Sequence, residues 1–422
     1  MKSDQFKKML AATCLFLLSM VWLFFTQSEV GDEPLFFGRW RTRHFGVTLI
    51  GCWILVAMAF SFLSRAAVFR FVLVSVGLGF TVFLLEILGL AGVVNYRQLL
   101  RVAPSGGLGS APTAMLELEG LTYEDLASSW GYPTEAMPFY FKTDRYGLRN
   151  HQDRANADIY LLGDSILVAG MLPFEKVVAS LLEQDLNRSV MNVALISISP
   201  QREVELLKET GLPLENRILL HFIFEGNDMK DSFEWRAKAD GTALELSRFE
   251  RTLTYNALIR LQRATSPPTT PQRRIGRLGG IDYLFGWTRS SFEPYHAELA
   301  FIAATLQDLA KNMAEAGGTY GVVFVPSKIR VIGPSCTWPE TSSLDGYEEH
   351  VSPMRTWLAD WAQEQGIPLL DTTDPLLLST ASGHIPWYPG DTHLNAIGHR
   401  VMADAIRGWT IFTPMSDTQE TP

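Results

Sequence analysis

Four polar residues, far apart in the sequence, are of the types that acyl transfer requires. Ser165 offers a hydroxyl nucleophile, and His393 offers an imidazole base. Asp391 can fix the tautomer of that imidazole, and the side-chain amide of Asn227 can bind a developing oxyanion. A nucleophile, a base, a group that orients the base and an oxyanion donor together make a site for ester chemistry, provided that the fold brings them to one place.

The segments around these residues predict such a fold. After residue 140, short apolar runs alternate with longer amphipathic ones, which is typical of an α/β domain whose parallel sheet is covered on both faces. Ligands of an open sheet bind beyond the carboxyl ends of its strands. Polar turns follow the apolar runs at 163–165, 196–200 and 225–228, and a further polar loop, 388–399, leads into the last helix. The predicted strands are 158–165, 189–195, 216–228, 320–328 and 367–373, and the predicted helices are 174–187, 201–211, 296–318, 351–366 and 395–409.

Three sequence blocks resemble, in their order, those of the SGNH (GDSL) hydrolase family. They are GDS at 163–165, GND at 226–228 and GDTHLNAIGH at 390–399, and the resemblance covers residues 140–410. The Asp-Thr-His spacing is one residue shorter than the family's common form and looks like the branch that contains alginate-acetylation proteins of the bacterial periplasm, which are O-acetyltransferases and esterases. The resemblance implies a flavodoxin-like, three-layer domain around a central parallel sheet.

Carried over position by position, the resemblance implies a role for each residue. Ser165 would be the nucleophile, His393 the base that activates it, and Asp391 the carboxylate that orients the base. The oxyanion would be bound by the backbone amides of Ser165 and Ser197 and by the side chain of Asn227, and each such donor is worth about 3 kcal/mol of barrier. The supporting residues of the same blocks would be Asp164, which shapes the turn, Gly226, and Asp228, which orients Asn227 or its loop.

Two stretches outside these blocks, YGLRN (146–150) and VPSK (325–328), are similar to those of membrane-attached members of the family. Lys328, at the end of the second stretch, could bind an anionic substrate near the site, and a solvated loop lysine is the alternative. His399 lies on the last predicted helix and is expected to be structural. No metal or other cofactor is expected, because no further ligand cluster accompanies His399 and the base block.

The sequence departs from the family pattern at three places. Ser197 stands where glycine is usual, and a serine held there at positive φ would cost about 1 kcal/mol. Glu225 takes the first position of the usual Gly-x-Asn-Asp block, and the base block is shortened. These departures keep open a non-catalytic alternative, in which the fold binds acylated glycan or serves as a scaffold in a membrane acylation complex.

Charge and cysteine content exclude other classes of protein. Residues 1–101 carry ten Lys and Arg against five Asp and Glu, which leaves 26 against 40, a balance of −14, for residues 102–422. An acidic C-terminal part argues against nucleic acid as a partner, since phosphate binding needs clustered cations. The three cysteines form no zinc-binding or disulfide pattern.

The N-terminal part is predicted to be membrane-embedded. Three apolar segments, 9–26, 46–63 and 71–94, each reach the length of about 18 residues that a crossing helix needs. Lysines before the first segment favour a cytoplasmic N-terminus, which places the chain after residue 95 outside the cytoplasm of a bacterial cell, at the inner membrane. Glu86, the one charge of the third segment, is expected either to contact protein or to reach the membrane interface.

The predicted domains are a membrane domain at 1–95, a linker and preliminary lobe at 96–140, an SGNH-like domain at 141–412 with an irregular insertion at 229–292, and a tail at 413–422. The predicted function is that of a membrane-anchored, extracytoplasmic serine esterase or O-acyl(acetyl)transferase that forms an acyl-serine intermediate on envelope or surface glycans. A lipase or thioesterase is a further alternative. By resemblance, a multi-spanning acyl-donating membrane protein would be its partner, and the sequence does not choose between water and a sugar hydroxyl as acceptor.

Overall fold

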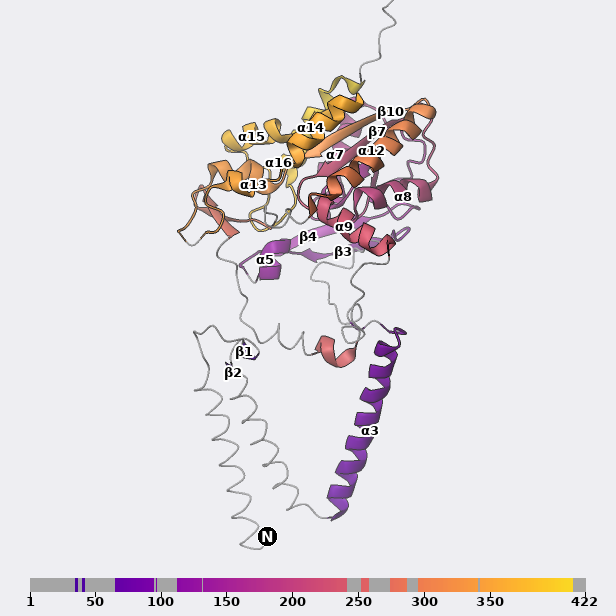
Figure 1. Cartoon of the computed structure of the whole chain (residues 1–422), viewed down its shortest axis with the longest axis vertical. Helices are drawn as coiled ribbons and strands as arrows, with labels where there is room; N and C mark the ends of the chain where they lie inside the picture. Colours follow the sequence, from indigo (N-terminus) through magenta and orange to yellow (C-terminus); the bar gives the residue numbers. More distant parts are fainter. Residues whose placement is uncertain are drawn as a thin grey trace, which may run out of the picture. The chain divides into compact units, whose positions relative to one another are not determined.

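The computed structural model describes residues 35–36, 40–41, 65–94, 96, 112–130, 132–240, 252–257, 274–286, 295–340 and 342–412. The chain divides into two compact units. The first comprises Met1–Val102 and Leu244–Thr269, and the second comprises Ala103–Ala243 and Thr270–Pro422. Every residue to which the sequence assigns chemistry lies in the second unit (Figure 1).

A five-stranded parallel sheet forms the centre of the second unit and confirms the predicted α/β class. Its spatial order is β11-β10-β7-β5-β6. The chain therefore leaves β5 toward β6 on one side and afterwards builds the sheet outward on the other. The carboxyl end of β5 is the point at which the strand order reverses, where open α/β sheets bind their ligands. The strands are β5 (Ile159–Gly163), β6 (Val190–Ala194), β7 (Ile218–Phe224), β10 (Thr319–Val325) and β11 (Leu369–Asp371).

Helices cover both faces of the sheet because alternate side chains of its apolar strands point to opposite faces. On β5, Ile159 and Leu161 belong to one buried core, whereas Tyr160 and Leu162 belong to the other. The first core also takes side chains from α7 (Val178–Leu186), α13 (Lys328–Ile332), α15 (Thr373–Ala381) and α16 (Ala396–Arg407). The second takes them from α8 (Pro200–Thr210), α12 (Glu298–Glu315) and α14 (Met354–Gln365).

Two additions lie outside this framework. A hairpin of β3 (Glu117–Thr122) and β4 (Met137–Lys142), with α5 (Asp125–Trp130) between its strands, forms the preliminary lobe. The described parts of the insertion predicted at 229–292 form helix α9 (Asp228–Ala239) and a hairpin of β8 (Ile275–Leu278) and β9 (Ile281–Leu284). Its loop-like stretch, 264–274, lies outside the described residues except at its last position. Helix α9 escaped prediction because half of its residues are charged, which leaves little apolar periodicity to detect.

The described part of the first unit consists mainly of α3 (Arg65–Leu90), which overlaps the predicted segment 71–94. The short strands β1 (Leu35–Phe36) and β2 (Trp40–Arg41) pair with each other. In the part of the chain that the structure describes, no helix combines the length and the hydropathy that a membrane crossing needs. The predicted segments 9–26 and 46–63 and the tail 413–422 lie outside the described residues. A side-chain oxygen of Glu86 accepts a hydrogen bond from the backbone amide of Thr254, within the same unit (2.6 Å).

Candidate active site

Ser165 stands directly at the carboxyl end of β5, at the first position of the short helix α6 (Ser165–Val168). Asp164 caps this helix, since its side chain accepts a hydrogen bond from the amide of Ile166 (2.9 Å). Gly163 is required for close packing, because a Cβ there would lie 2.9 Å from a Leu167 methyl group. The turn therefore holds the serine hydroxyl at the strand-order reversal of the sheet.

Ser165, His393 and Asp391 form one continuous hydrogen-bonded array, although 228 positions separate the first two. The Nε2 atom of His393 lies 3.0 Å from the Ser165 hydroxyl, and its Nδ1 atom lies 2.6 Å from Asp391 Oδ1. The same carboxylate oxygen accepts the backbone amide of His393 (2.8 Å). A carboxylate can only accept, so in the neutral imidazole Nδ1 carries the proton and Nε2 can accept one from the hydroxyl.

The charges around His393 make its imidazole a strong base. Burial lowers the pKa of His393, but the ion pair and hydrogen bond with Asp391, together with the charges of Asp125 and Asp164, raise it further, to about 9. Burial raises the pKa of Asp391, yet the charge and hydrogen bond of His393 outweigh burial and leave that pKa below its usual value. The pair is therefore held in its charged form at neutral pH.

A second carboxylate, Asp125 of α5, braces the loop that carries the base, and the sequence analysis missed it. Its backbone amide donates to Asp391 Oδ2 (2.7 Å), and its own carboxylate accepts the amide (2.9 Å) and the hydroxyl of Thr392. Burial and the charge of Asp391 raise the pKa of Asp125. Nothing in the sequence near Asp125 marks it, because its partners lie more than 260 positions away.

Asp125, Asp391 and His393 place their ligand atoms within 4.8 Å of one another. Hydrogen bonds between the Asp391 carboxylate, the imidazole and the brace account for this spacing. His399 belongs to a different environment: it is fully buried on α16, its Nδ1 accepts the amide of Val178 (3.3 Å), and burial lowers its pKa to about 3. The structural role expected for His399 fits these contacts.

The backbone of Ser197 has a φ of 56°, in the left-handed region that favours glycine, so the condition under which the sequence analysis assigned a cost of about 1 kcal/mol is met. Asn227 follows the buried Gly226 and donates through its side-chain nitrogen to Asp231 Oδ2 (2.5 Å). Asp228 accepts the amide of Phe224 (2.7 Å), so it fixes the turn after β7. One amide hydrogen of Asn227 is thus engaged by Asp231. The oxyanion-binding role of Asn227 stays a prediction.

Lys328 is not a solvated loop residue, so that sequence interpretation was wrong, and its contacts argue against the alternative role in substrate binding. Its side chain is buried, and its ammonium group donates to the carbonyl oxygens of Tyr388 (2.7 Å), Pro389 (2.7 Å) and Asp391 (3.0 Å). Three donors for three acceptors leave no hydrogen for a substrate. Burial lowers the pKa of Lys328 to about 8, against the opposing charge of Asp391. The sequence could not reveal this, because the acceptors are backbone atoms of a distant loop.

Glu225, at the position where the family has glycine, joins the turn after β7 to the turn after β10. Its buried carboxylate accepts the amide and hydroxyl of Ser327 (both 2.9 Å), the hydroxyl of Ser352 (2.8 Å) and the guanidinium of Arg330. Each oxygen of this carboxylate therefore has partners, as a buried charge requires. The VPSK stretch accordingly positions two loops at the rim of the sheet.

The YGLRN stretch (146–150) holds the segment after the nucleophile turn through hydrogen bonds. The buried guanidinium of Arg149 donates to the carbonyl oxygens of Val168 (2.6 Å), Ala169 (2.5 Å) and Leu172, directly after α6. Asn150 binds the backbone of β6 at Asn192 in both directions (2.9 and 3.0 Å). These contacts tie the segment after the serine to the sheet.

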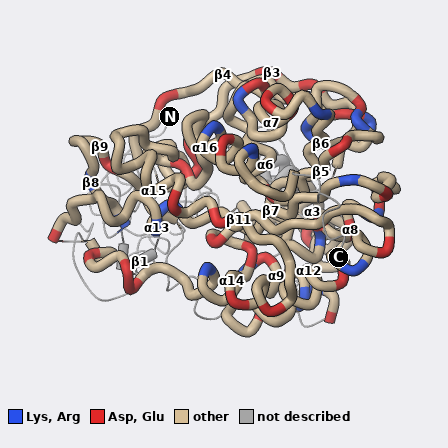
Figure 2. Tube along the Cα trace, turned by 90° about the horizontal axis from the view of Figure 1, so that it is seen from above, with Lys and Arg blue, Asp and Glu red and all other residues tan. Residues whose placement is uncertain are grey.

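A pocket of about 140 Å³ opens at the serine and the imidazole. The β3–β4 lobe closes one side of it, and its remaining walls are mainly apolar. The lining residues are Thr122, Tyr123, Asp125, Phe139, Ser165, Ala169, Gly170, Met171, Leu172, Ile196, Asp391, His393 and Leu394. Around the described part of the second unit, Lys and Arg are interspersed with Asp and Glu along the chain (Figure 2).

Comparison with known proteins finds similar folds among solved structures. The chain matches an acetyl xylan esterase (12% identity, TM-score 0.32, 59% of this chain and 96% of that one). It also matches a protein described as an SGNH hydrolase, from Slackia heliotrinireducens (13%, TM-score 0.32, 59% and 96%), and an acetyl-xylooligosaccharide esterase from Geobacillus Stearmophilus (12%, TM-score 0.31, 61% and 96%). No family model and no curated protein matches the sequence.

Proposed function

We propose that this chain is a serine esterase or O-acyltransferase, and the Ser165–His393–Asp391 hydrogen-bonded array carries the proposal. The Ser165 oxygen attacks the carbonyl carbon of an ester while its proton passes to His393 Nε2. The tetrahedral intermediate then expels the alcohol, which takes that proton, and leaves acyl-Ser165. Water or a second alcohol gives its proton to His393 and attacks the acyl carbon; the bond to the Ser165 oxygen breaks, and that oxygen takes the proton back from His393.

The size of the pocket favours a short acyl group. Its volume of about 140 Å³ is small beside the roughly 300 to 1,000 Å³ of typical ligand pockets, which suits an acetyl group and the atoms next to it. A long acyl chain would exceed this volume, so the pocket supports the esterase over a lipase. The intact array supports an enzyme over a non-catalytic scaffold, because a scaffold has no use for a hydroxyl directed at an imidazole.

The proposal extends to an acylated glycan as substrate, to a membrane-embedded acyl donor as partner and to attachment at the bacterial inner membrane with the site outside the cytoplasm. The apolar segments 9–26, 46–63 and 71–94 support attachment. We expect the full chain to stay in the membrane pellet after an alkaline carbonate wash. Release into the supernatant would contradict attachment and leave the chemistry at Ser165 untouched.

Trapping of the acyl-enzyme tests the chemistry. The full chain, kept in mild detergent, is mixed with p-nitrophenyl acetate and quenched in acid, and intact mass is followed by peptide sequencing in the mass spectrometer. We expect one added acetyl group, located at Ser165, and none at that peptide in Ser165→Ala. Equal acetylation of the two proteins, spread over lysines, together with equal release of p-nitrophenol, would refute the proposal.

A further inference from the structure

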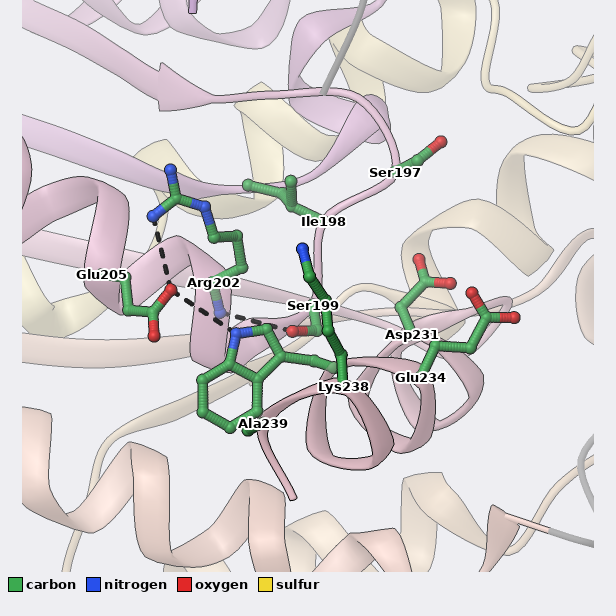
Figure 3. A pocket seen from close by; sticks show the side chains of 10 residues that line it. Ser197, Ile198, Ser199, Arg202, Glu205, Asp231, Glu234, Lys238 and Ala239 are labelled. Carbon is green, nitrogen blue, oxygen red and sulfur yellow. Dashed lines mark hydrogen bonds and ion pairs between the residues drawn. The ribbon is translucent and has the colours of Figure 1, made fainter. Parts of the chain in front are cut away.

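A second, larger cleft opens beside the serine pocket, between the turn after β6, the first turns of α8 and one face of α9 (Figure 3). Its volume is about 730 Å³, within the range of small-molecule binding sites. Figure 3 shows Asp231 and Glu234 at one side of the view and Arg202 and Glu205 at the other. The residues that line it are Ser197, Ile198, Ser199, Arg202, Glu205, Asp231, Glu234, Trp235, Lys238 and Ala239.

The cleft and the serine pocket share a wall. Ile196 lines the pocket of Ser165, and the next residue, Ser197, lines the cleft. Asp231, which also lines the cleft, holds the side chain of Asn227 (2.5 Å). The two predicted oxyanion groups outside the nucleophile turn therefore adjoin the cleft: Ser197 is part of its wall, and the side chain of Asn227 contacts the wall through Asp231. A molecule that fills the cleft would lie next to the reacting ester.

The chemistry of the walls fits a polyhydroxylated ligand. Carboxylates of Asp231, Glu205 and Glu234 accept hydrogen bonds, and hydroxyl groups donate them. Half-buried Trp235 adds a large apolar surface; its ring nitrogen is 3.5 Å from Glu205 Oε2, and its ring packs against Phe301 at a centroid distance of 5.8 Å. The indole is therefore held in place before a ligand arrives.

The charge balance of the cleft selects a neutral ligand. Three carboxyl groups and two cations line it, and burial raises the pKa of Asp231 to about 7, so the net charge of the lining is close to zero. Arg202 is already bound to carboxylates of its own helix, at 2.6 and 2.8 Å from Glu209 and at 3.3 Å from Glu205. Glu234 is likewise paired with Lys230 (3.1 Å). The cations near the cleft are thus largely engaged by carboxylates and offer an anionic polymer little attraction, whereas neutral sugar rings would meet oxygen acceptors and an aromatic surface.

We infer that this cleft is a glycan subsite, which binds neutral sugar residues of the acylated or accepting chain and places their ester or hydroxyl at Ser165. The inference rests on the proposed function for its purpose, but sugar binding can be measured without any turnover. The subsite would make the enzyme prefer polymeric glycan over small esters, because binding energy from distant sugar rings is used to orient the reacting group.

Titration calorimetry on the full chain in detergent tests the subsite, with cellohexaose, xylohexaose and mannohexaose as neutral probes and hexamannuronate as the anionic one. We expect at least one neutral probe to bind and Trp235→Ala to weaken that binding at least tenfold. Glu234→Ala, a change at a side chain that is 61% exposed and thus harmless to folding, is expected to weaken it several-fold. Phe233→Ala is the matched control on the same helix, outside the cleft lining, and should bind as the wild type does.

Three results would each overturn the subsite. The first is that none of the three neutral probes binds. The second is that Trp235→Ala and Glu234→Ala bind as tightly as the wild type, and the third is that hexamannuronate binds more tightly than the neutral probes. The p-nitrophenyl acetate assay separates this failure from failure of the proposed function. The two cleft variants should keep wild-type kcat/KM on that small ester, within about twofold, because it is too short to reach the cleft. If sugar binding is lost in the variants while Ser165 proves inert, the subsite stands and the esterase falls.

Discussion

Replacing His393 by alanine is expected to lower kcat/KM for a small acetate ester by about a thousandfold or more. The Nε2 atom of His393 lies 3.0 Å from the serine hydroxyl, so this imidazole is the base that can take its proton. Without it, the proton of the Ser165 hydroxyl has no acceptor, and a neutral hydroxyl is a weak nucleophile. Stopped assays with p-nitrophenyl acetate measure the loss, and circular dichroism checks that the fold is retained.

Residues that act as one unit are not additive, which gives the sharpest control. The double variant Ser165→Ala/His393→Ala should be no slower than Ser165→Ala alone. His384→Ala, at an exposed histidine elsewhere on the second unit, should keep full activity. More than a tenth of wild-type activity in His393→Ala, or additive losses in the double variant, would contradict the role of the array.

The pH profile is the second measurement of this role. The imidazole must be neutral to accept a proton, and a pKa of about 9 leaves it mostly protonated at neutral pH. We therefore expect kcat/KM to rise about tenfold per pH unit and to level off near pH 9. The reference pKa of histidine, about 6.5, would place this rising limb at lower pH; the limb is displaced because the carboxylates of Asp391, Asp125 and Asp164 favour the charged ring. Asp125→Asn removes one of them and should move the limb toward lower pH; a limb that stays at 6.5 in both proteins would contradict this account.

Replacing Lys328 by methionine is expected to lower the free energy of unfolding by about 3 kcal/mol and kcat by about a hundredfold. Methionine fills the space of the stem but leaves the carbonyls of Tyr388, Pro389 and Asp391 buried without their donor. These carbonyls shape the loop that ends at His393, so the distance between imidazole and hydroxyl would lose its restraint. Urea unfolding followed by tryptophan fluorescence measures the first effect and steady-state kinetics the second.

Lys311→Met is the matched control, since that side chain is 74% exposed and lies on α12. It should change neither stability nor rate beyond experimental scatter. Because Lys328 positions the base and does not bind substrate, the loss should fall on kcat, with the KM for p-nitrophenyl acetate nearly unchanged. A pure rise in KM would instead return Lys328 to the substrate-binding role that its contacts argue against.

The sheet could be predicted from the sequence because its signals are local. A run such as Ile159–Gly163 is wholly apolar, ends in glycine and is followed by an amphipathic segment, so strand, turn and helix are legible within about thirty residues. Parallel strands all end at one edge, which predicted that the turns after the strands, that of Ser165 among them, would meet there. That His393 joins them followed from the resemblance of its block to the family pattern.

The supports of the site could not be predicted because their signals are not local. Asp125 and Lys328 act on the base loop through backbone atoms, and any residue type presents the same amides and carbonyls, so no pattern in the loop announces its partner. Helix α9 is similar: its charged sequence has weak periodicity, and its face on the cleft exists only because α8 packs beside it.

The sequence by itself determined the class of the sheet, the order of its strands along the chain and the four residue types at its rim. Only the tertiary structure decided which strand lies beside which, that Lys328 is buried on three carbonyls, and that a second carboxylate raises the basicity of His393. The physical reason is the separation along the chain over which each kind of interaction acts. Periodicity and turn chemistry act between neighbours in the chain, whereas burial, charge and hydrogen-bond partners depend on groups that meet only after the chain has closed around its core.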